Sequence, residues 1–263
     1  MPKSEKYNSK HPDAQGLFSY TSEEDSVWGE LYVRQLDFLK GRICQEYFDG
    51  VDALGLTADR VPQVRYIDAC LAKASGFGVA GVPAIIPPSK FYALLADRKF
   101  PVATFLRTRE DMDYIEEPDI FHEVFGHCPL LTNRAYTDFV EGFGKLAKEL
   151  GKSYTWHLFR LFWFTVEFGM IHTPNGLRGY GAGIASSPAE AKFATGGKAV
   201  TTDADLLTML RTPYRIDIVQ PQYFVIDRFE DLPRLIDCDV AAAVDEAKRL
   251  GDLPPMFEPK AAA

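Results

Sequence analysis

Residues 118–127 read PDIFHEVFGH, and residues 161–169 read LFWFTVEFG. The first stretch holds His122 and His127, two of only five histidines in the chain, and the second holds Glu167 among aromatic residues. Burying a carboxylate in so apolar a stretch costs on the order of several kcal/mol unless a cation meets it. Two neutral imidazoles and one carboxylate can hold a metal dication and leave about three octahedral positions open, which suits ferrous iron in an oxygenase. The pattern therefore predicts an iron oxygenase.

Each of these residues taken singly has a simpler explanation. A histidine on an apolar helix is more often a satisfied core residue than a ligand, and Glu167 could pair with Arg160 of the same segment. Two other classes of protein also stay open, a zinc hydrolase with a His2Glu ligand set and a non-catalytic helical binding module. The combination of two clustered histidines with one acid in an aromatic helix favours a metal site.

The spacing of the two histidines argues against the zinc peptidase pattern. In that pattern the histidines lie at i and i+4, about 40° apart around a regular helix, whereas positions i and i+5 lie about 140° apart. A regular helix cannot aim both imidazoles at one ion. We therefore predict a wide turn or local distortion between His122 and His127, aided by Gly126 and ended by Pro129.

Composition indicates a soluble enzyme of one domain. The chain has 263 residues, and its 29 basic against 37 acidic residues give a net charge of −8 without any basic run. This charge argues against nucleic acid and anionic membrane as partners. The four cysteines have no metal-type pairing, and no signal peptide or membrane-spanning apolar run of about 20 residues is present. A cytoplasmic location is expected.

The distribution of apolar residues predicts a fold that is mainly α with a few short β-strands (α+β). Residues 1–22 are polar and predict a flexible N-terminal arm, and residues 23–263 are expected to form a single catalytic domain. Helices are expected over 23–48, 63–74, 89–96, 118–127, 135–150, 154–171, 187–194, 203–211 and 239–249. A strand is expected over 102–106, and a hairpin is expected from 215–219 and 223–227.

The chain resembles one known family. Its segments Tyr114–Leu130, Trp163–Gly169 and Tyr180–Ser187 are similar, in unbroken order, to the pterin-dependent aromatic amino acid hydroxylases. The likeness extends over about residues 60–230 and is strongest to the short bacterial members that act on phenylalanine. The resemblance implies a basket of helices and loops around a mononuclear iron site. It also implies that His122, His127 and Glu167 bind Fe(2+) as the catalytic centre, with tetrahydropterin and O2 as cosubstrates.

The activity implied by the resemblance is hydroxylation of L-phenylalanine to L-tyrosine, the reaction of a phenylalanine 4-monooxygenase. Hydroxylation of tryptophan, or of phenylalanine at the meta position, is the alternative within the family. A monomer is expected, because the chain has no room for the family's regulatory domain or tetramerisation helix. Coupling to a pterin-carbinolamine dehydratase and a dihydropteridine reductase is expected, although the sequence marks no docking site for them.

Arg107 is the first residue expected to bind the substrate. Its planar fork suits a bidentate grip on an amino acid carboxylate, and the family uses the arginine seven residues before Tyr114 in this role. A surface salt bridge is the ordinary alternative. Asp119, three residues before His122, is a candidate hydrogen-bond acceptor for an imidazole, and an acidic helix start is its alternative.

The resemblance gives the remaining substrate residues. Trp163 lies one helical turn before Glu167 and is expected to wall the substrate ring, and its bulk favours a benzene ring over an indole. Ile216 is an apolar residue where phenylalanine hydroxylases tend to have one. Without the resemblance, Trp163 would be explained by core packing and Pro118 by the first turn of a helix. Ser186 and Ser187 would be explained by helix capping. The full substrate set is Arg107, Pro118, Trp163, Ser186 and Ser187.

The resemblance also assigns a cosubstrate loop to residues 84–91, where Phe91 is expected to stack on the pterin. Without the resemblance, a proline-rich turn and a core phenylalanine would describe the segment. Pro87 and Pro88 depart from the family pattern and remove two amide donors. The expected pterin-binding set is Ala84, Ile86, Phe91 and Glu123.

Overall fold

Helices build most of the molecule, as a computed structural model shows for residues 6–83, 85–115 and 117–258. The α-helices are α1 (Ser22–Leu39), α2 (Gln45–Leu54), α3 (Val64–Ala74), α4 (Pro88–Ala96), α5 (Arg134–Leu150), α6 (Thr155–Phe162), α7 (Ala182–Ser186), α8 (Pro188–Ala194), α9 (Leu206–Arg211), α10 (Asp231–Leu235) and α11 (Val240–Leu250). The strands are β1 (Gly78–Val82), β2 (Lys99–Ala103), β3 (Met170–Thr173), β4 (Gly176–Gly179), β5 (Val200–Asp203) and β6 (Gln222–Ile226). Two π-helices, η2 (Phe121–His127) and η5 (Trp163–Glu167), and the short 3-10 turns η1 (Arg109–Asp111), η3 (Leu130–Thr132) and η4 (Lys152–Tyr154) complete the chain. The expected fold class, mainly α with a few short strands, is confirmed.

The long helix expected over 23–48 is two helices. Thr21 begins α1 with a capping box, in which its hydroxyl accepts from the Glu24 amide and the Glu24 carboxylate accepts from the Thr21 amide. After α1 the chain turns at Gly41, whose φ of 75° is a left-handed conformation that favours glycine. The Cys44 amide then donates to the Gly179 carbonyl at 3.0 Å, so the break between α1 and α2 is held by a distant strand.

The strands form two small sheets. β1 and β2 pair in parallel, and the second sheet has the order β4-β3-β6-β5, in which β6 runs parallel to both β3 and β5. The expected strand over 102–106 overlaps β2, but the expected hairpin is wrong. Residues 215–219 lie in a loop, because the carbonyls of Arg215 and Ile218 accept hydrogen bonds from the Gln220 side chain. β6 instead pairs with strands that are distant in sequence.

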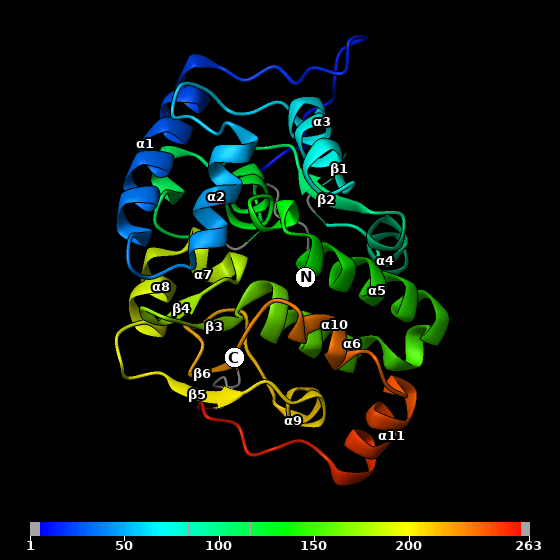
Figure 1. Ribbon diagram of the computed structural model, residues 1–263. Helices are drawn as coiled ribbons and strands as arrows, with labels where there is room; N and C mark the ends of the chain where they lie inside the picture. Colours follow the sequence, from blue (N-terminus) through cyan, green and yellow to red (C-terminus); the bar gives the residue numbers. More distant parts are fainter. Residues whose placement is uncertain (1–5, 84, 116, 259–263) are drawn as a thin grey trace.

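The aromatic core surrounds η2. Phe121 and Phe125 stack with ring centroids 4.7 Å apart, and Trp28 of α1 meets Phe121 edge-on at 5.6 Å. Tyr47 of α2 donates its buried hydroxyl to the Phe125 carbonyl at 2.6 Å. Figure 1 shows α1, α2 and α3 at one end of the molecule and α11 at the other, with α5 to α8 between them. Aromatic packing therefore fixes η2 against α1 and α2.

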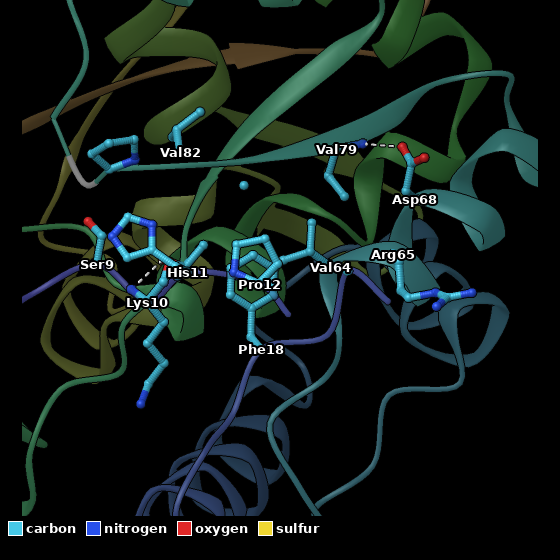
Figure 2. Close-up of a pocket in the computed structure, with 14 residues that line it drawn as sticks. Ser9, Lys10, His11, Pro12, Phe18, Val64, Arg65, Asp68, Val79 and Val82 are labelled. Carbon is cyan, nitrogen blue, oxygen red and sulfur yellow. Dashed lines mark hydrogen bonds between the residues drawn. The ribbon is translucent and has the colours of Figure 1, made fainter. Parts of the chain in front are cut away.

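The N-terminal arm lies against the body of the molecule. Tyr7 is largely buried and stacks on Phe105, with ring centroids 4.9 Å apart, and the Lys10 amide donates to the Thr104 hydroxyl at 3.0 Å. Residues between 9 and 18 of the arm line an open cavity of about 310 Å³ together with α3 and β1 (Figure 2). The flexibility of residues 1–22 and the domain boundary at residue 23 stay predictions. No helix in the described part of the chain has the length and apolar character needed to cross a membrane.

Candidate active site

The π-helix η2 explains the five-residue spacing of the histidines. In a π-helix the hydrogen bonds join residues five apart, so side chains at i and i+5 lie above one another. The Nε2 atoms of His122 and His127 are accordingly 3.2 Å apart. The local distortion predicted between them is confirmed. Gly126 lets α7 approach η2, because a Cβ at this position would lie 3.0 Å from the Ala182 carbonyl; its part in the distortion itself stays a prediction.

Glu167 completes the cluster from the second π-helix, η5. Its Oε1 lies 3.2 Å from His127 Nε2, and its Oε2 lies 3.5 Å from His122 Nε2. The alternative pairing of Glu167 with Arg160 is wrong, because the Arg160 guanidinium pairs with Asp252 at 2.6 Å and also donates to a backbone carbonyl. Two imidazoles and one carboxylate therefore face one another, as the sequence pattern predicted.

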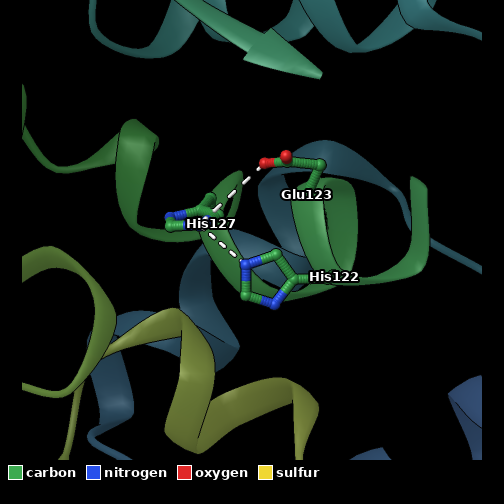
Figure 3. Close-up of side chains that lie close together, drawn as sticks. All are labelled: His122, Glu123 and His127. Atoms are coloured by element: carbon green, nitrogen blue, oxygen red, sulfur yellow. Dashed lines mark hydrogen bonds and ion pairs between the residues drawn. The ribbon is translucent and has the colours of Figure 1, made fainter. Parts of the chain in front are cut away.

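Glu123 is a second carboxylate near the histidines. One nitrogen or oxygen atom of each of His122, Glu123 and His127 lies within 4.8 Å of the others, and Figure 3 shows the three side chains together. The Glu123 carboxylate, however, is 4.0 Å from His127 Nε2, farther than that of Glu167. Geometry therefore favours Glu167 as the metal-binding carboxylate and leaves Glu123 at the edge of the site.

Burial sets the charges of the cluster. It lowers the pKa of His122 to about 4, against the opposing effect of the Glu167 charge, so the imidazole is neutral at physiological pH. Burial also pushes the pKa of Glu167 upward, but the His127 and His122 imidazoles outweigh it and hold that pKa below its usual value. The pKa of Glu123 lies well above its usual value because of burial and the nearby charges of Glu167 and Asp119. One ionised carboxylate beside imidazole nitrogens is a donor set that a dication fits.

Ser186 determines which nitrogen of His122 carries the proton. The Ser186 hydroxyl donates to the Ala182 carbonyl at 2.9 Å, and its oxygen lies 2.8 Å from His122 Nδ1. Because the single hydroxyl proton is already used, His122 Nδ1 is the donor of this contact. Its Nε2 is then left with a lone pair that points at His127 and Glu167, which is the tautomer that binds a metal.

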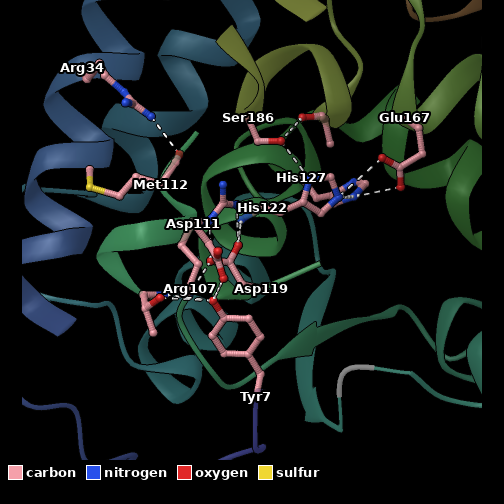
Figure 4. A network of polar contacts seen from close by, with 12 residues as sticks. Tyr7, Arg34, Arg107, Asp111, Met112, Asp119, His122, His127, Glu167 and Ser186 are labelled. Carbon is pink, nitrogen blue, oxygen red and sulfur yellow. Dashed lines mark hydrogen bonds and ion pairs between the residues drawn. The ribbon is translucent and has the colours of Figure 1, made fainter. Parts of the chain in front are cut away.

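Asp119 does not orient an imidazole, and that hypothesis is wrong. Its carboxylate accepts the Arg107 Nε and Nη2 protons, both at 2.8 Å, together with the backbone amides of Arg107 and His122. Figure 4 shows this pair with Tyr7 on one side and His122 with Ser186 on the other. Arg107 is thus a buried residue held rigidly by Asp119, and its Nη1 makes no hydrogen bond to the described residues.

A cavity of about 490 Å³ opens above the cluster. All five residues expected to bind substrate line it, together with His122 and Glu167; the five are Arg107, Pro118, Trp163, Ser186 and Ser187. Ile216 also lines it. Ser187 additionally caps α8, accepting from the Glu190 amide at 3.3 Å. The structure therefore brings the expected substrate residues into one cavity beside the cluster.

Sequence reasoning missed other residues of this cavity. They include Ile115, Phe168, Ala189, Glu190 and Val219. They belong to different elements and loops: Ile115 and Phe168 lie within segments that carry the family resemblance, whereas Ala189, Glu190 and Val219 lie outside those segments. Only the folded chain brings them to the same wall.

The expected pterin residues lie apart from this cavity. Phe91 is on α4, where its ring centroid is 5.2 Å from that of Phe162, and neither it nor Ile86 lines the cavity. Ala84 lies outside the described residues. The pterin-binding roles of these residues and of Glu123 stay predictions.

Glycines allow the two halves of the cluster to approach. A Cβ on Gly181 would collide with the Glu167 carbonyl, and a Cβ on Gly183 would meet the Phe168 ring at 2.5 Å. The absence of side chains lets α7, which ends at Ser186, pack against η5, which ends at Glu167. Ser186 and Glu167 therefore reach His122 from two elements in close contact.

Comparisons with known proteins agree with this site. A family model described as biopterin-dependent aromatic amino acid hydroxylase matches residues 3–240. A phenylalanine-4-hydroxylase of Pseudomonas aeruginosa is 47% identical over 261 residues, which are 99% of this chain and 100% of that protein. The structure of phenylalanine hydroxylase from Legionella pneumophila is similar with a TM-score of 0.93 at 44% identity, covering 95% of this chain and 100% of that one. The structure of the phenylalanine hydroxylase of Chromobacterium violaceum with bound oxidized Fe(III) is similar with a TM-score of 0.89 at 36% identity, covering 98% of this chain and 94% of that one.

A mainly helical domain in which two imidazoles and a carboxylate meet below an aromatic cavity is the architecture of a non-haem hydroxylase. The chain belongs to the biopterin-dependent aromatic amino acid hydroxylase family. The resemblance seen in the sequence is thereby confirmed.

Replacing Ser186 by alanine should weaken metal binding about 10- to 100-fold, because the His122 tautomer and ring orientation are no longer fixed. The measurement is a competition titration of the purified protein with a divalent metal and a chelator. Ser187→Ala is the matched control: it removes the cap of α8, costing about 1 kcal/mol of stability, without touching His122. Equal metal affinity of Ser186→Ala and the unaltered protein would rule out this role.

Proposed function

We propose that this protein is an iron- and tetrahydropterin-dependent monooxygenase that hydroxylates L-phenylalanine to L-tyrosine with O2. The observation that carries the proposal is the convergence of His122, His127 and Glu167 on one point at the floor of a cavity that Arg107 and Trp163 also line. The names of relatives that match over their full length support the choice of phenylalanine.

We propose that His122, His127 and Glu167 hold Fe(2+). The fit rests on the chemistry of the donors: two imidazole nitrogens and one ionised carboxylate face one another, and the imidazoles are the ion-pair partners of Glu167 among the described residues. A zinc hydrolase could use the same donor types, but the iron bound in the Chromobacterium violaceum relative favours iron. When bound, iron and tetrahydropterin together supply the reduction of O2 that puts one oxygen atom on the aromatic ring.

The chain's own residues bind and orient the substrate. Arg107 presents its remaining guanidinium edge to the amino acid carboxylate while Asp119 holds the other edge. Trp163, Pro118 and Ile216 wall the aromatic ring. Holding the ring between apolar walls next to the metal donors excludes water and keeps the para carbon near the cluster.

We propose that the pterin lies on the side of the cluster marked by Glu123. Phe91 is only partly buried, so part of its ring is accessible for stacking. Ile86 and Ala84 would contribute backbone groups to the edge of the pterin. Glu123 is close to His127, which puts its carboxyl group where a cosubstrate beside the metal would meet it.

We further propose a cytoplasmic monomer in which residues 23–263 form the catalytic domain and residues 1–22 an arm. The four cysteines are unpaired in the structure, which agrees with a reducing compartment. A pterin-carbinolamine dehydratase and a dihydropteridine reductase would regenerate the cosubstrate.

Alanine at any one of His122, His127 or Glu167 should abolish hydroxylation and stoichiometric iron binding while the chain stays folded, because each removes one of three ligands. Metal analysis and circular dichroism measure both properties. Glu123→Ala is the matched control and should keep its iron, since Glu123 lies farther from the donors. A variant that retains stoichiometric iron and turnover would remove its residue from the ligand set.

Arg107→Lys should raise the KM for phenylalanine by an amount equivalent to about 1.5 to 3 kcal/mol, since an ammonium cannot hold Asp119 and a carboxylate through two parallel pairs of bonds. Steady-state kinetics of the iron-loaded protein measure it. The control Arg109→Lys makes the same change two residues on, where the guanidinium binds exposed Glu23 and Glu30 outside the cavity. An unchanged KM in Arg107→Lys with normal iron content would exclude Arg107 from substrate binding.

The proposed function is tested by kcat/KM for phenylalanine, tyrosine and tryptophan under saturating pterin and O2, with products identified. Phenylalanine is expected to be preferred, with para-tyrosine as product, although an apolar pocket separates similar rings by only about 1 to 3 kcal/mol. Tryptophan equal to phenylalanine, or meta-tyrosine as the main product, would contradict the proposed substrate or position. Activity with zinc in the absence of O2 would favour the hydrolase, and no O2 uptake with any amino acid would favour a binding module.

A further inference from the structure

A buried amide joins two walls of the substrate cavity. Gln220 is only 2% exposed and lies in the loop between α9 and β6. Its Oε1 accepts the indole proton of Trp163 at 3.0 Å, while its Nε2 donates to the Arg215 carbonyl at 2.8 Å and to the Ile218 carbonyl at 2.9 Å. Both amide protons are therefore used, and the amide oxygen accepts one bond.

The first wall is the Trp163 indole. Its ring stacks on Tyr214, with centroids 4.5 Å apart and planes inclined by 21°, and it lies 4.6 Å from the Phe168 ring. These contacts fix the plane of the indole, but stacked rings can still slide and turn within that plane. The bond from its Nε1 to Gln220 fixes that remaining freedom.

The second wall is the loop of residues 216–219, which lines the cavity without any strand pairing. Ile216 and Val219 are about 40% exposed, at 42% and 39%, so side-chain packing alone holds this loop weakly. The Arg215 guanidinium ties the loop internally to Asp217 and outward to the Glu258 carbonyl, and Gln220 adds the bonds that join the Arg215 and Ile218 carbonyls to the Trp163 side. Two side chains therefore join the walls: Tyr214 stacks on Trp163 just before the loop, and Gln220 is the one that hydrogen-bonds to both Trp163 and the loop.

Glu190 of α8 anchors the backbone of Gln220. The Gln220 backbone amide donates to Glu190 Oε1 at 2.9 Å, and the Tyr223 hydroxyl donates to the same oxygen at 2.8 Å. Glu190 is buried and lines the cavity. Gln220 is thus positioned from its backbone as well as from its side chain, as a fixed spacer has to be.

We propose that Gln220 is a specificity-determining positioning residue. It sets the width of the slot for the aromatic ring by joining Trp163 to the loop of residues 216–219 through the Arg215 and Ile218 carbonyls. The inference rests on the proposed function, because it presumes that an aromatic amino acid occupies this cavity. A fixed narrow slot suits a single ring, whereas separated walls admit an indole. Loss of the tie should therefore weaken phenylalanine recognition and relax discrimination against tryptophan.

Gln220→Glu is the sharpest test. The carboxylate keeps the length of the side chain and its acceptor for Trp163, but it cannot donate to the Arg215 and Ile218 carbonyls. Gln222→Glu is the matched control, because it makes the same change two residues on, where Gln222 donates to Thr202 and does not line the substrate cavity. Gln220→Asn, uncharged but one methylene too short to span both walls, is the second variant.

The readout is the ratio of kcat/KM for phenylalanine to that for tryptophan, measured on the iron-loaded protein. This ratio does not depend on the fraction of active protein, so partial unfolding cannot imitate the effect. Gln220→Glu and Gln220→Asn are expected to lower it about tenfold, the worth of a small misfit in an apolar pocket, with iron content unchanged. Gln222→Glu should leave it unchanged. Calorimetric binding of phenylalanine to the protein gives an independent measure and should weaken in the Gln220 variants alone.

An unchanged ratio in a folded Gln220 variant would overturn the inference. So would failure of both Gln220 variants to fold beside a folded Gln222→Glu, because the role would then be structural only. Absence of hydroxylation by the unaltered protein would instead count against the proposed function. In that case the calorimetric comparison decides the inference by itself.

Discussion

The buried Glu167 carboxylate is the constraint on which the rest of the structure depends. Such a charge is tolerable inside a protein only beside a cation or donors that stabilise it, and the His127 and His122 imidazoles that meet Glu167 hold its pKa below the usual value despite burial. To bring all three side chains together, both segments leave the α-helical geometry and become π-helices. Glycines in and before α7 then let it pack directly against one of them. Irregular backbone is concentrated at the functional centre, where it does what a regular helix cannot.

Separate hydrogen bonds orient the separate side chains around the cluster. Ser186 fixes the tautomer of His122, and Asp119 fixes Arg107. Both supports are themselves buried and satisfied by backbone groups, so they hold one geometry instead of several. The His122 imidazole and the Arg107 guanidinium are therefore held in fixed orientations relative to each other.

The cavity follows the same rule on its aromatic side. Stacking holds Trp163 in a plane, and a buried amide holds it within that plane. Apolar contacts supply most of the affinity for a ring but discriminate poorly between rings of similar size, because one methylene is worth only about 1 to 3 kcal/mol. Polar ties behind the apolar walls are the means by which a pocket keeps the shape on which that small difference depends.

The sequence by itself determined the helical class, the family and the residues of the candidate metal site. Helical periodicity gave α5 within about one residue, and the identities of His122, His127 and Glu167 gave the donor set before any coordinates. It also required the histidine segment to leave regular helical geometry. Only the tertiary structure decided that Asp119 binds Arg107, that residues 215–219 form a loop, and that Gln220 joins two walls. The reason is physical. Periodicity and motifs report on neighbours along the chain, whereas these features depend on partners up to 57 residues apart that meet only after the chain has packed.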